Sequence, residues 1–186
     1  MLQSCATSCD RAAKQALNDA KELQNIDSVF DLSAKDIHGQ TIDFSKFRGQ
    51  VTIIVNVASY CGYTDSHYRG LVKLWSSVKH ASVNILAFPC NQFGAQEPES
   101  NESIEQFALG YGVEFTMMEK IDVNGAGASI VYKYLKAQAD DAPANIGWNF
   151  ATYFVVAPDG SVTAHSGVEP MELKDMALGL LESDEL

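Results

Sequence analysis

The sequence predicts an α/β fold in which a mixed central sheet is flanked by helices. Residues 51–58 and 83–88 are short apolar runs rich in β-branched side chains, which is typical of strands buried on both faces. Between them, residues 64–79 carry apolar side chains at helical spacing, so the three segments predict a parallel strand–helix–strand unit. Further along, Pro-Asp-Gly at 158–160 separates two apolar segments and predicts an antiparallel hairpin at the edge of the sheet.

Length and composition are those of one acidic globular domain. The chain has 186 residues, of which 46% are hydrophobic, and this is enough for a packed core. Thirteen Lys and Arg against 24 Asp and Glu give a net charge of −11. This charge argues against nucleic acid or an anionic membrane as the main partner. No stretch is long and apolar enough to predict stable membrane insertion.

The chain divides into an N-terminal extension, residues 1–24, and a domain that covers residues 25–186. Residues 10–23 are rich in Ala, Lys, Gln, Leu and Glu, which are all good helix formers. The apolar face of this segment is thin. We therefore expect a helix that packs at the edge of the body or frays.

The other elements complete the predicted order. Residues 29–34 and 40–44 flank His38-Gly39, a plausible hairpin turn. Asn101 is expected to cap a helix, and Glu102 favours the positive end of that helix. The remaining segments are two helices, 128–137 and 171–181, and the two strands of the hairpin, 153–156 and 161–165. This order fits a thioredoxin-type fold with an insertion.

Four cysteines, Cys5, Cys9, Cys61 and Cys90, are too few for a disulfide-built scaffold, and their spacing does not fit a zinc site. Cys61 directly follows a predicted buried strand and precedes a helix. The free N–H groups at a helix start favour a thiolate, which is the nucleophilic form of cysteine. A buried structural cysteine is the alternative, and position alone leaves both interpretations open.

Three motifs change that balance. Residues 56–64 read NVASYCGYT, residues 86–98 read LAFPCNQFGAQEP, and residues 148–150 read WNF. The first two closely resemble the two long signatures of glutathione peroxidases, and the third is similar to a shorter one. The motifs are long and occur in the family's order. The resemblance extends over residues 26–181, which is nearly the whole predicted domain.

The resemblance implies a catalytic tetrad of Cys61, Gln96, Trp148 and Asn149. Cys61 takes the place that selenocysteine holds in some relatives and reduces hydrogen peroxide and organic or lipid hydroperoxides through a sulfenic acid. The other three supply neutral N–H donors, which can stabilise negative charge without being nucleophiles. The resemblance implies no metal or organic cofactor. A thiol such as glutathione, or a protein dithiol of the thioredoxin or disulfide isomerase type, is the co-substrate.

The residue that resolves the sulfenic acid is less clear from the sequence. Relatives that use thioredoxin carry a cysteine in the helix after the second signature, where this chain has Leu109. Residues 107–113 instead look like the phospholipid-hydroperoxide and endoplasmic-reticulum branches. Cys90 ends a strand that is expected to lie beside the one leading to Cys61, so it is a possible resolving residue. The alternative for Cys90 is a packed small side chain, and we expect an external thiol to resolve Cys61.

Two features concern assembly and location. Only twelve residues separate Leu135 from Trp148, whereas tetrameric relatives carry a longer loop there, so a monomer with an open active site is implied. The last four residues, 183–186, read SDEL and resemble an endoplasmic-reticulum retention signal. We therefore expect the lumen of that compartment, with a disulfide isomerase as partner. The first nine residues lack the apolar run of a signal peptide, so the cytoplasm is the alternative.

Two other functions remain as alternatives to a peroxidase. One is a redox sensor or oxidative-folding partner that passes its disulfide to a protein disulfide isomerase. The other is a thioredoxin-like disulfide reductase, which is disfavoured because Cys61 has no partner at C-x-x-C spacing.

Overall fold

The computed structural model describes the backbone of residues 2–183 and the side chains of residues 13–182. Its centre is a five-stranded sheet with the strand order β5-β4-β3-β6-β7. β3 pairs in parallel with β4 and antiparallel with β6, so the predicted mixed sheet is confirmed. The hairpin β6–β7 forms one edge of the sheet. The strands are β3 (Val51–Val57), β4 (Val83–Pro89), β5 (Thr116–Met117), β6 (Thr152–Val156) and β7 (Val162–Ser166).

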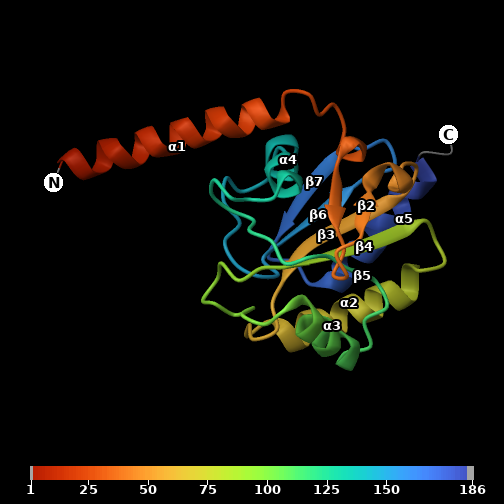
Figure 1. Cartoon of the computed structure of the whole chain (residues 1–186). Helices are drawn as coiled ribbons and strands as arrows, with labels where there is room; N and C mark the ends of the chain where they lie inside the picture. The colour runs from red at the N-terminus through yellow and green to blue at the C-terminus, as the bar shows by residue number, and fades with distance from the viewer. Residues whose placement is uncertain (1, 184–186) are drawn as a thin grey trace.

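Helices cover both faces of the sheet (Figure 1). On one face, the core contains side chains from α2 (Thr64–Val78), α3 (Asn101–Gly110) and α5 (Leu173–Ser183). On the other face, α4 (Ile130–Gln138) packs with two short 3₁₀ helices. Alternate residues of β3 enter the two cores, as neighbours in a strand point to opposite faces. The parallel strand–helix–strand unit is the one that the sequence predicts.

The N-terminal part differs from expectation in its details. The helix α1 spans Leu2–Leu23 and reaches away from the body (Figure 1). The predicted strand at 29–34 is wrong in its first half, because Val29–Asp31 form a 3₁₀ helix. Ser28 and Asp31 close a capping box that stabilises this turn. The hairpin strands are only β1 (Ser33–Lys35) and β2 (Thr41–Asp43).

Other corrections concern the ends of elements. Ser100, and not Asn101, caps α3, because its hydroxyl accepts the Ser103 N–H. The Asn101 side chain instead accepts the Lys120 N–H at 3.2 Å. A 3₁₀ helix, Pro170–Glu172, precedes α5. The two-residue strand β5 was not predicted.

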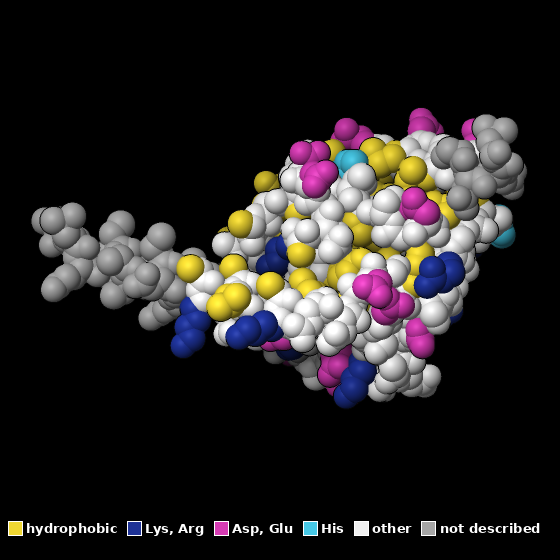
Figure 2. Space-filling view, turned by 90° about the horizontal axis from the view of Figure 1, so that it is seen from above, with side chains coloured by type: hydrophobic (Ala, Val, Ile, Leu, Met, Phe, Trp, Pro, Cys, Tyr) yellow, Lys and Arg dark blue, Asp and Glu magenta, His cyan; other side chains and the backbone are white. Residues whose placement is uncertain are grey.

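The surface agrees with the acidic composition. Figure 2 shows Asp and Glu side chains at several separate places on the face seen from above, with Lys and Arg between them. The chain as a whole still carries eleven more acidic than basic side chains. Within the part of the chain that the structure describes, no helix is both long and apolar enough to cross a bilayer.

Candidate active site

Cys61 lies in the loop between β3 and α2, at the carboxyl end of the central strand. α2 begins at Thr64, so the predicted placement of Cys61 just before a helix is confirmed. The Cys61 side chain is 7% exposed and borders the core that β3 shares with α2. The Cys61 side chain is therefore buried, with a small part of it accessible to solvent.

Thr64 fixes the backbone around this cysteine. Its hydroxyl donates to the Ala58 carbonyl at 2.6 Å and accepts the Cys61 N–H at 3.0 Å. The Thr64 N–H donates to the Cys61 carbonyl at 3.1 Å. The buried hydroxyl thereby links the segment after β3 to the first turn of α2, and Cys61 lies between the two linked residues, Ala58 and Thr64.

Gln96 reaches the same place from the loop that follows β4. The Tyr60 N–H donates to the Gln96 carbonyl at 3.0 Å, so this loop is bonded to the residue next to Cys61. Ala95 has a φ of 50°, in the left-handed region that most residues avoid. After this turn, the Gln96 side chain is half-buried.

Asn149 and Trp148 arrive from the segment before β6 and are held by Asn56 of β3. The Asn56 amide donates to Asn149 Oδ1 at 3.1 Å and to the Trp148 carbonyl at 3.3 Å. The Asn56 carbonyl accepts the Phe150 N–H at 2.9 Å. Phe150 has a φ of 63°, so this backbone is strained and held in place by its neighbours.

This arrangement sets the orientation of the Asn149 amide. Because Oδ1 accepts from Asn56, Nδ2 is the donor group, and it donates to Gln96 Oε1 at 3.5 Å. The Trp148 ring contacts Phe93 at a centroid distance of 5.7 Å and remains 39% exposed. The structure thus brings Gln96, Trp148 and Asn149 together, next to the loop that carries Cys61.

Cys90 lies on the other face of the sheet. Its side chain is fully buried in the core that α4 covers, whereas Cys61 borders the core that α2 covers. Burial raises the pKa of Cys90 to about 11, against the opposing effect of nearby backbone N–H groups. The two strands are neighbours as expected, but the two thiols are separated by the sheet. The side chains of Cys5 and Cys9 lie outside the described residues.

Sequence reasoning missed Glu97 as an unusual group. Its side chain has no exposed surface, although Glu normally lies at the surface. Burial raises the pKa of Glu97 to about 7, while Ser59 and Lys120 act in the opposite direction. Glu97 directly follows Gln96 in the second signature, and this position could have marked Glu97 as a residue of interest. The motif names the residue but not its burial.

His67 is a second residue whose surroundings the sequence did not reveal. It lies on α2, is buried, and its Nδ1 is 2.6 Å from the Tyr153 hydroxyl. Its ring borders a cavity that also includes Trp148. The neighbouring Glu169 carboxylate lies 3.9 Å from His67 Nε2.

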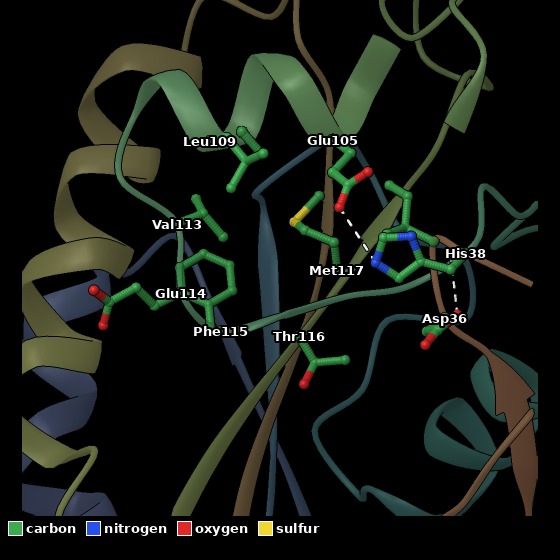
Figure 3. Close-up of a pocket in the computed structure, with 11 residues that line it drawn as sticks. Asp36, His38, Glu105, Leu109, Val113, Glu114, Phe115, Thr116 and Met117 are labelled. Carbon is green, nitrogen blue, oxygen red and sulfur yellow. Dashed lines mark hydrogen bonds and ion pairs between the residues drawn. The ribbon is translucent and has the colours of Figure 1, made fainter. Parts of the chain in front are cut away.

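A separate hollow lies away from these residues, along β5 and the end of α3 (Figure 3). It encloses about 200 Å³, and His38 Nε2 lies 3.2 Å from Glu105 Oε1 in its wall. Leu109, the residue at the resolving position of some relatives, borders this hollow and is 52% exposed. None of the four predicted catalytic residues lines it.

Comparisons with known proteins concern the family of this chain. A family model described as glutathione peroxidase matches residues 29–136. Glutathione peroxidase 7 of Homo sapiens is 47% identical over 140 residues, which cover 75% of this chain and 73% of that protein. A probable phospholipid hydroperoxide glutathione peroxidase of Mesembryanthemum crystallinum is 48% identical over 137 residues, which cover 73% of this chain and 80% of that protein.

The fold has a wider set of relatives. The crystal structure of a thioredoxin-family thiol:disulfide interchange protein from Chlorobium tepidum matches with a TM-score of 0.60, over 81% of this chain and 92% of that one. Its sequence identity is 14%, so the likeness shows the thioredoxin-like fold alone. Family assignment comes from the sequence matches, because they cover most of the domain at high identity. The chain belongs to the glutathione peroxidase family and is a thiol-dependent peroxidase that reduces hydroperoxides.

Proposed function

We propose that Cys61 is the peroxidatic residue and that Gln96, Trp148 and Asn149 form its donor set. The Cys61 thiolate attacks one oxygen of the hydroperoxide, and the O–O bond breaks. The leaving oxygen takes a proton and departs as water or an alcohol, while Cys61 becomes a sulfenic acid. The observation that carries the proposal is the 3.5 Å approach of Asn149 Nδ2 to Gln96 Oε1, beside the loop of Cys61.

The donors suit the charge that moves during this step. Negative charge passes from sulfur to the leaving oxygen, and neutral N–H groups stabilise both without taking part as nucleophiles. Asn56 holds the Asn149 side chain so that Nδ2 is its donor group; one N–H donates to Gln96 Oε1, and the proposal assigns the other to the reacting atoms. Trp148 is exposed enough to meet a substrate at the surface.

An external thiol resolves the sulfenic acid in this proposal. One thiol condenses with it to a mixed disulfide and releases water, and a second thiol then frees Cys61. The buried position of Cys90 on the opposite face argues against a Cys61–Cys90 disulfide, because the sheet lies between them. Leu109 occupies the position where some relatives carry a resolving cysteine. A disulfide isomerase-type dithiol is the preferred reductant, ahead of glutathione.

Single-turnover measurements with purified variants test these roles. We expect Cys61→Ser to abolish peroxide reduction, whereas Cys90→Ser, Cys5→Ser and Cys9→Ser leave it intact. Gln96→Ala, Trp148→Phe and Asn149→Ala should each slow the reaction by about 10²–10³, the usual cost of one charge-stabilising donor. Unchanged second-order rate constants in all three donor variants would exclude the tetrad. Turnover by the Cys61 variant would exclude the peroxidatic assignment.

The same reaction separates the modes of resolution. After one equivalent of peroxide without reductant, mass spectrometry should find a sulfenic acid on Cys61 and reduced Cys90. A stoichiometric Cys61–Cys90 disulfide that forms as fast as the sulfenic acid would assign the resolving role to Cys90. A protein that reacts once but does not turn over with any thiol would favour the redox sensor.

Location and assembly are further parts of the proposal. The resemblance of residues 183–186 to a retention signal supports a location in the endoplasmic-reticulum lumen. The last three of these residues lie outside the described part of the chain. The short segment between α4 and Trp148 supports a monomer. Fractionation of cells that express the chain with and without its last four residues tests the first point. Sedimentation at equilibrium tests the second, and a tetramer would contradict it.

A further inference from the structure

A cavity of about 450 Å³ opens beside Trp148, one of the four proposed catalytic residues. Trp148 forms part of its wall, and so does Tyr63, which follows Cys61 by two positions. This volume lies in the range of small-molecule sites. The other lining residues are His67, Phe150, Ala151, Gly167, Val168 and Glu169.

The walls of this cavity are mainly aromatic. The His67 ring lies between Tyr63 and Phe150, at centroid distances of 5.6 and 5.3 Å. Tyr63 and Trp148 both expose large apolar surface to solvent at the rim. Such surface gains most from covering by an apolar group, because burial removes it from water.

The cavity wall contains one acidic side chain among the residues that the structure describes, that of Glu169. Among the same described residues, no Lys or Arg lines the cavity. Burial lowers the pKa of His67, and the charge of Glu169 only partly offsets this, so the imidazole is uncharged at neutral pH. The hydroxyl of Tyr153, 2.6 Å from Nδ1, adds a second uncharged group behind the ring.

We propose that this cavity binds the organic part of an uncharged hydroperoxide while the peroxide group meets Cys61. The inference deepens the proposed function and rests on the peroxidatic role of Cys61. An aryl or alkyl group covers the aromatic walls and is not repelled by Glu169. A carboxylate in the same place faces Glu169 with no cation to pair with it, so the cavity selects hydroperoxides by charge as well as by shape.

Glutathione fits this wall poorly for the same reason. It carries two carboxylates and one ammonium group, and its net charge at neutral pH is negative. Repulsion from Glu169 disfavours its carboxylates inside the cavity. The occupant is therefore the oxidising substrate and not the thiol reductant.

Filling the cavity provides the first test. In Val168→Trp, a large ring replaces a half-buried side chain of the wall. We expect the ratio of kcat/KM for cumene hydroperoxide to kcat/KM for hydrogen peroxide to fall about tenfold or more, as for an obstructed apolar pocket. Tyr63→Ala removes an exposed part of the wall and should lower the same ratio. It serves as the test if Val168→Trp does not fold. Dithiothreitol serves as reductant throughout.

Leu109→Trp is the matched control. It adds the same ring beside the separate hollow of Figure 3 and should leave the ratio unchanged. An unchanged ratio in both cavity variants would overturn the inference. A selective loss in the thiol half-reaction would also overturn it, because the cavity would then hold the reductant. If the wild-type protein did not reduce hydrogen peroxide, this result would instead contradict the role of Cys61.

A charged probe tests the second half of the inference. Para-carboxylated cumene hydroperoxide keeps the shape of cumene hydroperoxide and adds one negative charge. We expect the wild-type protein to reduce it about three to ten times more slowly, and Glu169→Gln to narrow this difference. If the ratio of the rates for the two hydroperoxides is the same in the wild-type protein and in Glu169→Gln, the cavity does not select by charge.

Discussion

At the scale of single residues, the hydroxyl of Thr64 bonds to both sides of the Cys61 turn. Thr64→Val keeps the shape of the side chain but leaves the Ala58 carbonyl and the Cys61 N–H without this partner. We expect the free energy of unfolding to fall by about 1–3 kcal/mol, the cost of unpaired buried groups. Peroxide reduction should slow about tenfold or more, because small displacements of a reacting group are costly. Denaturant titration and stopped-flow rates measure the two effects.

Ser66→Ala is the control for that variant. Ser66 lies in the same first turn of α2, and its hydroxyl donates to the Tyr63 carbonyl at 3.2 Å on the exposed side. We expect it to leave both quantities nearly unchanged. If Thr64→Val changes stability and peroxide reduction no more than Ser66→Ala does, the hydrogen bonds of the Thr64 hydroxyl do not position Cys61.

Glu97 gives a prediction about pH. Its pKa is about 7 in the fold and near the usual 4.5 in the unfolded chain, so the folded protein keeps the proton longer. The stability from this group is present below about pH 4.5 and is lost as the pH rises through 7. Glu97→Gln should therefore stabilise the protein by about 3 kcal/mol at most above pH 7, and by little near pH 4.5.

Urea titrations at several pH values measure the Glu97 effect. Glu99→Gln, which removes an exposed carboxylate two residues away, is the control. If the two variants show the same dependence on pH, the pKa of Glu97 is not raised in the fold and the buried-acid interpretation fails.

At the scale of elements, the sequence predicts the central structure well and the short elements poorly. The strands at Val51–Val57 and Val83–Pro89 are recognisable because both faces are buried and the runs are continuously apolar. β5 has two residues, too few for any periodicity. The turn at Val29–Asp31 depends on one capping box, which local sequence pattern did not separate from a strand. The motifs name the candidate site residues, but the separation of Cys61 and Cys90 depends on which face each side chain meets.

The attachment of α1 to the body depends on Lys133 of α4. Its ammonium group is almost fully buried, 2.8 Å from Glu22 and 3.0 Å from Asp19, and it also donates to the Ala126 carbonyl. In Lys133→Met the two α1 carboxylates, which are partly exposed, lose their partner. We expect the free energy of unfolding to fall by about 1 kcal/mol. Amide exchange in α1 should become faster than in the wild-type protein, while exchange in β3 changes less.

Lys21→Met is the control for this attachment, because Lys21 is an exposed residue of α1. It should leave exchange in α1 unchanged. Equal exchange of α1 amides in the wild-type protein and in Lys133→Met would show that other contacts hold the helix. Peroxide reduction should not change in either variant, which would support the division into an extension, residues 1–24, and a catalytic domain.

At the scale of the whole molecule, charge is the property that the fold does not determine. A thioredoxin-like sheet is shared with proteins as distant as 14% identity, but the net charge of −11 belongs to this chain. Acidic side chains are spread over the face in Figure 2 and are not collected in one patch. Lys120 near the proposed site has its ammonium group engaged with the Glu97 and Glu99 carbonyls. We expect the net charge of −11 to make the field around Cys61 negative, against the positive charge that Lys120 keeps when it donates to these neutral carbonyls.

This field leads to a prediction about thiol reductants. Glutathione is anionic, cysteamine is cationic and 2-mercaptoethanol is neutral, so the three thiols should respond differently to salt. Raising the ionic strength from 0.01 to 0.15 M shortens the screening length from about 30 to about 8 Å. Reduction of oxidised Cys61 should then become about two to ten times faster with glutathione and slower with cysteamine, with little change for 2-mercaptoethanol. Stopped-flow measurement of the thiol half-reaction gives these rates directly. The same salt response for glutathione and cysteamine would show that local cations cancel the net charge at the active site, and the expected preference for a docked protein dithiol would lose its electrostatic basis.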